Sequence, residues 1–248
     1  MALAWAYSIG SVLIVSLISL IGVIGLSIRA EKLKYLLLFF VSFSGGALLG
    51  DAFMHLLPEA AEAGFNFTMS LYILGGIIVF FVVEKYIHWH HCHIGPGERH
   101  PHPFAYMNLL GDSIHNFIDG LIIGASYIAG IPLGIATTVA VILHEIPQEI
   151  GDFGVLLHGG FSTSKALLMN FLVSLTAVAG TILALVLSQY IPHLSTFLIP
   201  FAAGGFIYIA GSDLIPELHK EVLWKKSLIQ LATFILGMAV MYGLLLVE

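Results

Sequence analysis

The chain has 248 residues, of which 58% are hydrophobic and 10% are charged, and its formal net charge is −6. A soluble domain is about half apolar and about a quarter charged, so this composition excludes a soluble domain and indicates an integral membrane protein. The nine Lys and Arg residues form no basic stripe, which argues against nucleic acid as a partner. The single cysteine, Cys92, excludes an intrachain disulfide framework.

Apolar runs long enough to cross a bilayer predict about eight helices. These runs are continuous and do not alternate, which excludes a β-barrel, so the predicted fold class is an all-α membrane bundle. We expect one transmembrane domain over residues 1–248 and no cleaved signal peptide, because no basic segment precedes the first run. The helices are predicted near residues 4–28, 34–57, 69–88, 105–128, 133–157, 165–188, 195–218 and 226–247.

The basic residues predict the orientation of these helices. On this map, all nine lie in the first, third, fifth and seventh connections, and none lies in the other connections or in the tails. Because basic residues gather on the cytoplasmic side, we expect both termini outside. The nine residues are Arg29, Lys32, Lys34, Lys85, Arg99, Lys165, Lys220, Lys225 and Lys226.

Polar residues gather at the middle of the fourth and fifth predicted helices, at the same depth in the bilayer. Each set falls on one face of its helix, and a short Gly-Pro turn joins the two helices, so the sets can face one another. The fourth helix has Asp112, His115, Asn116 and Asp119 in "GDSIHNFIDG", and the fifth has His144, Glu145, Gln148, Glu149 and Asp152 in "HEIPQEIGD".

Carboxylates at this depth need a counter-charge. One charged side chain at a helix centre costs ~2.5–3.5 kcal/mol, and no Lys or Arg lies at this depth. Protonation is one remedy. A bound divalent metal is the other, and imidazole, carboxylate and amide oxygen at i, i+4 spacing favour it (His115 with Asp119, His144 with Gln148). Asn116 and Glu145, which directly follow His115 and His144 in the sequence, can bind a second, adjacent ion. The alternative is a polar seam that only joins helices.

The second and seventh predicted helices carry further acidic residues. "GGALLGDAFMHLLPEA" holds Asp51, His55 and Glu59, and "GGFIYIAGSDLIPEL" holds Asp213 and Glu217. Both segments begin with Gly-Gly and end in Pro-Glu, with spacings that differ by one residue, which suggests an inverted repeat or a chance match of small residues. We expect Glu59 at the outer mouth of a pathway and Glu217 at the inner one.

The third connection, "HWHHCHIGPGERHPHP", is rich in soft metal ligands. Its spacing matches no closed tetrahedral site, so we interpret residues 89–104 as a cytoplasmic loop that samples metal, with a solvated loop as the alternative. The candidate ligands are His90, His91, Cys92, His93, His100 and His102.

At "HNFIDG" and "HEIPQEIGD" the sequence resembles the ZIP (Zrt/Irt-like) divalent-metal transporters, and it is most similar to the subgroup whose fifth helix reads HExPHExGD. The segments "GDAFMHLLPEA" and "FIYIAGSDLIPEL" also resemble family patterns, so the resemblance covers nearly the whole chain. It implies an eight-helix bundle, commonly a homodimer, that moves Zn²⁺ toward the cytoplasm, with Fe²⁺, Mn²⁺ and Cd²⁺ as further substrates.

By this resemblance, two neighbouring metal sites are expected. His115, Asp119, His144 and Gln148 match the main transport site, and Asn116, Asp119, Glu145 and Gln148 match the second. The subgroup usually has His where this chain has Gln148, and a neutral amide is a harder and weaker ligand that cannot bridge two ions. This departure bears on zinc preference and on the occupancy of the second site.

An intramembrane zinc-dependent hydrolase is the main rival function, because H-E-x-x-H on a helix supplies two zinc ligands and a general base. Here Gln148 replaces the second His and Pro147 interrupts the motif. Acidic residues toward both faces favour a transporter over an enzyme, and a metal sensor or a structural protein leaves them unexplained. We expect Asp112, Glu149, Asp152, Asp213 and Glu217 to line the pathway, with no organic cofactor, in a prokaryotic plasma membrane.

Overall fold

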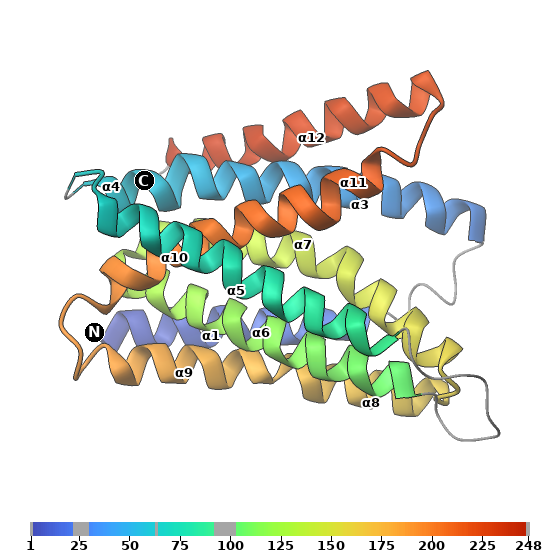
Figure 1. Cartoon of the computed structure of the whole chain (residues 1–248), viewed down its shortest axis with the longest axis horizontal. Coiled ribbons are helices and arrows are strands. Elements are labelled where there is room, and N and C mark those ends of the chain that lie inside the picture. The colour runs from blue at the N-terminus through green and yellow to red at the C-terminus, as the bar shows by residue number, and fades with distance from the viewer. Residues whose placement is uncertain (1, 22–29, 63, 92–102, 247–248) are drawn as a thin grey trace.

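The computed structural model describes residues 2–21, 30–62, 64–91 and 103–246, and within these ranges the chain is helical and contains no strand. Eight long helical segments lie side by side (Figure 1). They are α1 (Ala2–Ile18) with the 3₁₀ turn η1 (Ser19–Ile21); α3 (Ala30–Asp51) with η2 (Ala52–Leu56) and α4 (Leu57–Ala61); α5 (Phe67–His91); α6 (Pro103–Ala129); α7 (Ile131–His158); α8 (Thr163–Ser174) with α9 (Thr176–Leu187); α10 (Leu194–Ile209) with η3 (Ala210–Leu214) and α11 (Ile215–Leu218); and α12 (Trp224–Leu245).

These segments confirm the predicted all-α membrane bundle. Among the described residues, seven of the eight are long and apolar enough to cross a membrane. The exception is α6, a helix of 27 residues that carries four of the predicted polar site residues. The predicted end of the first helix, from residue 22 to 28, lies outside the described residues.

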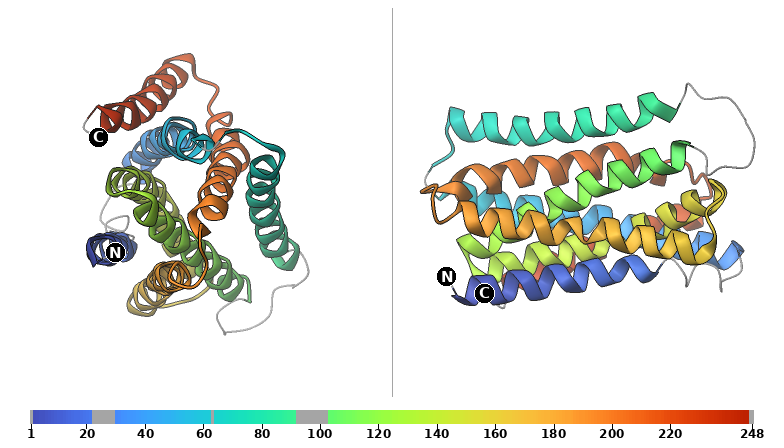
Figure 2. Two further views of the ribbon diagram at one scale, coloured as in Figure 1. Left: turned by 90° about the vertical axis from the view of Figure 1, so that its left-hand side faces the viewer. Right: turned by 90° about the horizontal axis from the view of Figure 1, so that it is seen from below.

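The eight segments form two groups that face each other (Figure 2). In one group α6 packs on α9 and α7, and α1 packs on all three; in the other, α3 packs on α12 and α10 packs on α5. The groups meet where α3 contacts α7 and where α10 contacts α6. Both ends of the described chain lie at the same end of the bundle, which we call the termini end (Figure 1). The opposite end, where α5 ends and α6 begins, is called the loop end.

The second group is built from two matching helix pairs in which backbones touch. A Cβ atom at Gly46 of α3 would lie 1.9 Å from the carbonyl oxygen of Phe234 in α12, and one at Gly204 of α10 would lie 2.0 Å from that of Ile73 in α5. Only glycine permits such an approach, because real Cβ atoms do not come this close to an oxygen. The first glycine of the second Gly-Gly pair therefore corresponds to the second glycine of the first pair.

The same correspondence extends along α3 and α10. The π-helical turns Ala52–Leu56 and Ala210–Leu214 stand the same 158 positions apart as Gly46 and Gly204, and each is followed by Pro-Glu. Because α3 and α10 run in opposite directions (Figure 1), the two pairs form an inverted repeat. The spacing difference seen in the sequence disappears once Gly46 is matched to Gly204.

An apolar core fills the termini half of the bundle. It includes Leu48, Ile122, Ala140 and Phe206, which are buried on four different helices. On α6 and α7, Ile122 and Ala140 lie nearer the termini end than Asp119 and His144 do. The polar residues therefore lie between this core and the loop end.

Candidate metal centre

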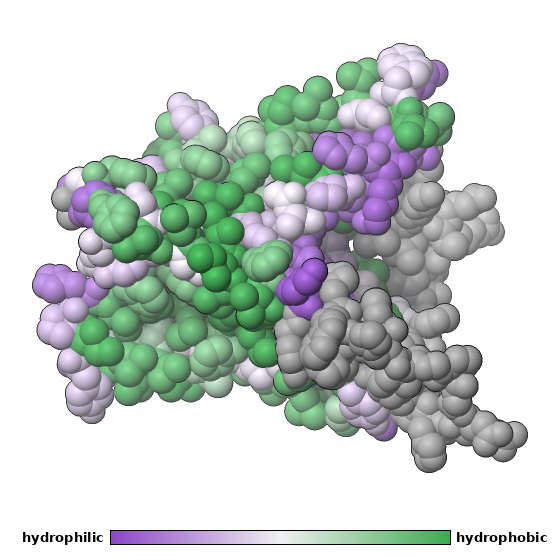
Figure 3. Space-filling view, in the orientation of Figure 1, coloured by the Kyte–Doolittle hydropathy of each residue, from purple (hydrophilic) through white to green (hydrophobic). Residues whose placement is uncertain are grey.

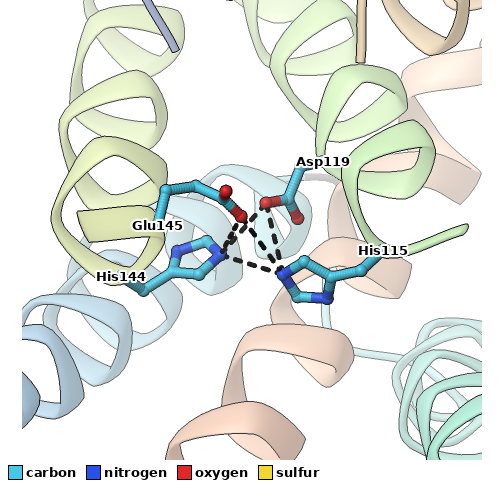
Figure 4. Close-up of side chains that lie close together, drawn as sticks. All are labelled: His115, Asp119, His144 and Glu145. Carbon is cyan, nitrogen blue, oxygen red and sulfur yellow. Dashed lines mark hydrogen bonds and ion pairs between the residues drawn. The ribbon is translucent and has the colours of Figure 1, made fainter. Parts of the chain in front are cut away.

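Four ligand side chains meet between α6 and α7 (Figure 4). His115 and Asp119 are i, i+4 neighbours on α6, and His144 and Glu145 are adjacent on α7. One potential ligand atom from each of the four lies within 4.8 Å of the others. The two helices are antiparallel and joined only at Gly130, which brings the middle of one against the middle of the other.

The distances among these atoms fit a single ion of zinc size. His115 Nε2 lies 3.3 Å from His144 Nε2 and 3.4 Å from Glu145 Oε1. His144 Nε2 lies 3.0 Å from Asp119 Oδ2 and 3.5 Å from Glu145 Oε1. Around a tetrahedral zinc with bonds of about 2.0–2.2 Å, ligand atoms stand roughly 3.3–3.6 Å apart. The four side chains thus present two imidazoles and two carboxylates with nearly this spacing.

The cluster is buried, and the protein places few hydrogen-bond donors around its carboxylate oxygens. Asp119 is 0% and Glu145 is 1% exposed. Among the described residues, the imidazoles of His115 and His144 are the groups that the structure places against Asp119 Oδ2 and Glu145 Oε1. Burying a carboxylate is costly unless it is paired or coordinates a metal, so a divalent cation is the partner that this donor set fits.

The surroundings orient the imidazoles. His144 Nδ1 lies 3.1 Å from the Ala140 carbonyl oxygen, which can only accept, so Nδ1 donates to this carbonyl and Nε2 points into the cluster. The ring of Phe206 lies 6.0 Å from that of His144, and the ring of Phe80 lies 6.0 Å from that of His115. These apolar rings limit the access of water to the ligands.

A proline inside α7 creates a contact with the other helix group. Pro147 lacks a backbone N–H, which leaves the Leu143 carbonyl without its helical donor. The Ser44 hydroxyl of α3 donates to that carbonyl and also lies 2.7 Å from the Phe40 carbonyl oxygen of its own helix. The freed carbonyl beside His144 is therefore satisfied by α3.

The two remaining amides of the predicted sites are held by Asp112. The Asn116 Nδ2 group donates to Asp112 Oδ1 over 2.8 Å, and the Gln148 Nε2 group donates to the same oxygen over 3.3 Å. The four residues that meet combine the two predicted sites: His115 and His144 from the main site, Glu145 from the second, and Asp119 from both.

A cavity of about 360 Å³ leads from the two histidines toward the loop end. Asn108, Asp112, Gln148 and Asp152 line it from α6 and α7. The Asn108 Nδ2 group donates to Asp152 Oδ1 over 2.9 Å. Sequence reasoning missed Asn108, although it lies one helical turn before Asp112 on the same face.

The opposite wall of the cavity comes from α5, α10, η3 and α11. It includes Glu84, Tyr208, Asp213 and Glu217, and the Tyr208 hydroxyl donates to a carboxylate oxygen of Glu84. Hydrophilic side chains gather at the loop end over α11, beside a largely hydrophobic middle of the same face (Figure 3). Glu84 and Tyr208 were not predicted; the available signal was one carboxylate near the end of an otherwise apolar helix.

Four predicted pathway residues do not line the cavity. The Asn170 side chain of α8 donates to a carboxylate oxygen of Glu149, which is 1% exposed. His55 Nε2 lies 3.0 Å from the Met241 carbonyl oxygen of α12, and Asp51, one turn away on α3, is fully buried. Glu59 lies in α4 at the termini end.

Most of the predicted metal-sampling loop, including Cys92, His93, His100 and His102, lies outside the described residues. Helix α5 continues to His91, beyond its predicted end at residue 88.

A family model described as "ZIP Zinc transporter" matches residues 2–104 and 101–245. The chain belongs to the ZIP zinc transporter family. It is 31% identical to "Zinc transporter zipt-7.2" of Caenorhabditis elegans, over 98% of this chain and 66% of that protein. It is 29% identical to "Zinc transporter SLC39A7" of Mus musculus, over 96% and 69%, and 33% identical to "Zinc transporter ZIP13" of Pongo abelii, over 88% and 69%.

The ZIP resemblance predicted from "HNFIDG" and "HEIPQEIGD" is thereby confirmed. Membership places the chain among transporters and not among enzymes, which rejects the intramembrane hydrolase. Together with its apolar helices, it makes the chain an integral membrane protein of a metal-transporting family. This ZIP chain spans about two thirds of the length of the relatives named above.

Proposed function

We propose that this ZIP protein moves Zn²⁺ across a membrane toward the cytoplasm through the four-residue cluster of His115, Asp119, His144 and Glu145. The observation that supports this most is the spacing of the four ligand atoms, which matches a tetrahedral zinc. The ligands stand near the middle of two helices of 27 and 28 residues, which is near the middle of a bilayer. Ionisable groups at such a depth usually mark an ion pathway.

The donor set favours zinc over harder cations. Imidazole nitrogen suits Zn²⁺, whereas Mg²⁺ and Ca²⁺ prefer sites made only of oxygen. Fe²⁺, Mn²⁺ and Cd²⁺ remain further candidate substrates, because two carboxylates accompany the two imidazoles. Three relatives are named zinc transporters, which supports the same choice.

The direction follows from the cavity and the charges. The cavity runs from the histidines toward exposed Glu217 at the loop end, whereas the apolar core closes the termini end. The five described Lys residues whose side chains are placed, among them Lys85 and Lys165, also lie at the loop end. Under the positive-inside rule the loop end is cytoplasmic and both termini are outside. The cavity then represents an inward-open route from the cluster, past Asp152 and Asp213.

The location and the assembly are part of the same proposal. The whole chain acts as one transporter domain, with its His-rich loop on the cytoplasmic side sampling released ions. The relatives named above are animal proteins, so they lend no support to a prokaryotic source. The homodimer implied by the family resemblance stays a prediction, which light scattering of the detergent-solubilised protein tests.

Radioactive zinc uptake into proteoliposomes tests the route. We expect His115→Ala and His144→Ala to abolish ⁶⁵Zn uptake, because each removes one of four ligands. Gln189→Ala is a matched control, since Gln189 is exposed at the termini end, away from the cavity. Size-exclusion profiles and melting temperatures show whether each variant folds. Normal uptake by both folded His variants would reject the cluster as the transport site.

A further inference from the structure

A second group of polar side chains links α6 to α7 on the loop-end side of the four ligands. It contains two carboxylates and two amides in alternation. Asp112 on α6 accepts from Gln148 on α7, and Asp152 on α7 accepts from Asn108 on α6. Asn108 and Asp112 are i, i+4 neighbours, as are Gln148 and Asp152, so the two hydrogen bonds stack one turn apart. We call these four residues the oxygen ring.

The hydrogen bonds of the oxygen ring leave oxygen atoms free. Both amides donate to an Oδ1 atom, so their own oxygens are not used in these bonds. Asp112 Oδ2 and Asp152 Oδ2 are buried, and no described group donates to either. Asp112 itself is only 6% exposed and lines the cavity. A buried carboxylate oxygen without a donor carries a large desolvation cost, so it calls for a cation or a proton.

Among the residues that the structure describes, no Lys or Arg lines the cavity. The described Lys residues lie at or beside helix ends. The cavity wall that faces the ring adds two further carboxylates, Glu84 and Asp213. Asn116 is the other donor to Asp112, and it uses the already occupied Oδ1 and the backbone carbonyl. The free Oδ2 atoms therefore remain the acceptors that a cation would find.

The oxygen ring is separate from the metal centre. Its members are centred about five residues along α6 from His115 and about five along α7 from Glu145, which corresponds to roughly 7–8 Å along the helix axes. Two ions can occupy the two places without sharing a ligand. None of the four ring residues belongs to the four-ligand cluster.

We propose that the oxygen ring is a second divalent-cation site, ligated by Asp112, Asp152 and the amide oxygens of Gln148 and Asn108, with water completing the shell. An all-oxygen site of this kind takes hard and borderline cations such as Mn²⁺ and binds Zn²⁺ less tightly than a site with two imidazoles. The inference rests on the proposed function for its role: an ion leaving the histidines passes to a weaker site on the way to the loop end.

Manganese binding tests this site directly, because Mn²⁺ is paramagnetic and reports whether nitrogen is among its ligands. Purified protein is titrated with Mn²⁺ and bound ions are counted by equilibrium dialysis, while pulsed electron paramagnetic resonance detects couplings to imidazole ¹⁴N. We expect two Mn²⁺ per chain in the unchanged protein, one with and one without these couplings.

Variants assign each ion. Asp152→Asn should keep the ion with ¹⁴N couplings and weaken the other by about tenfold or more, since affinity for such ions follows the number of charged ligands. The double variant His115→Ala/His144→Ala should keep only the ion without couplings. The exchange Asn108→Asp/Asp152→Asn retains one carboxylate and one amide in the same pair, so it should restore two ions.

Three results would overturn the oxygen ring as a site: a single Mn²⁺ in the unchanged protein, two undiminished ions in Asp152→Asn, or no recovery in the exchange variant. These results leave the transport route through the histidines standing. Conversely, normal ⁶⁵Zn uptake by the folded double His variant would reject that route while the Mn²⁺ count still decides the oxygen ring.

Discussion

Glu145→Gln tests whether the glutamate or the amide of Gln148 completes the metal centre. Glu145 Oε1 lies 3.4 Å and 3.5 Å from the two imidazole Nε2 atoms, whereas the described hydrogen bond of Gln148 goes to Asp112. The substitution keeps the shape of the side chain and removes one of the two negative charges that face the ion. Gln148→Ala removes the competing ligand and is the matched control.

The expected loss can be bounded from the geometry. Changing a group that only supports a metal ligand costs about 10–100-fold in affinity, so losing a charged ligand should cost at least about 100-fold, or ~2.8 kcal/mol. Gln148→Ala should change zinc affinity at the four-residue cluster by less than about tenfold, because its amide belongs to the oxygen ring and contacts none of the four ligands. Competition against a coloured zinc chelator in detergent measures both affinities.

The same substitution should stabilise the metal-free protein. Glu145 is 1% exposed, and a charge at the centre of a membrane helix costs ~2.5–3.5 kcal/mol, so Glu145→Gln should raise the melting temperature without zinc and lower it with zinc. Unchanged zinc affinity in Glu145→Gln together with a large loss in Gln148→Ala would refute this assignment. The ligand set implied by the family resemblance would then hold.

Three further substitutions or conditions have defined outcomes. Ser44→Ala leaves the half-buried Leu143 carbonyl without a donor and should cost about 1 kcal/mol of stability, read from denaturant unfolding; an unchanged midpoint would contradict the contact. Gly204→Ala places a Cβ against the Ile73 carbonyl and should destabilise the fold strongly in a thermal melt, whereas Gly10→Ala, with open space around it, should not; equal melting temperatures would show that α10 and α5 can separate freely. Zinc affinity should fall as pH falls from about 7.5 to 5.5, because imidazole and carboxylate bind zinc only when deprotonated; chelator competition across that range would show no trend if other groups held the ion.

The helices could be predicted from the sequence because each is a continuous apolar run between polar connections. The fifth predicted helix, at residues 133–157, is found at Ile131–His158, and the seventh, at residues 195–218, runs from Leu194 through Leu218. The inverted repeat was visible in the two Gly-Gly and Pro-Glu pairs. The sequence did not show that Gly46 matches Gly204, because this match depends on which neighbouring helix each glycine contacts.

The site could be predicted as a group of polar residues at one depth, but not in its internal arrangement. Adjacent positions on a helix point 100° apart, so the choice between Glu145 and Gln148 depends on how α7 rotates against α6, which one sequence does not specify. Glu149 fell on the predicted polar face, yet Asn170 of α8 holds it on another side of α7. Asn108, Glu84 and Tyr208 lie far from the two motifs in sequence and enter the site only through packing.

All four proposed metal ligands stand on α6 and α7, in one helix group, whereas Glu84, Tyr208 and Asp213 stand in the other. Within the groups, bare backbone contacts at Gly46 and Gly204 and threonine hydroxyls between α9 and α6 leave no room for sliding. A displacement of one helix group relative to the other would move the four ligands together past Glu84, Tyr208 and Asp213. The cargo would then keep its ligands while its surroundings change, so exposure to either side need not begin with breaking a metal–ligand bond.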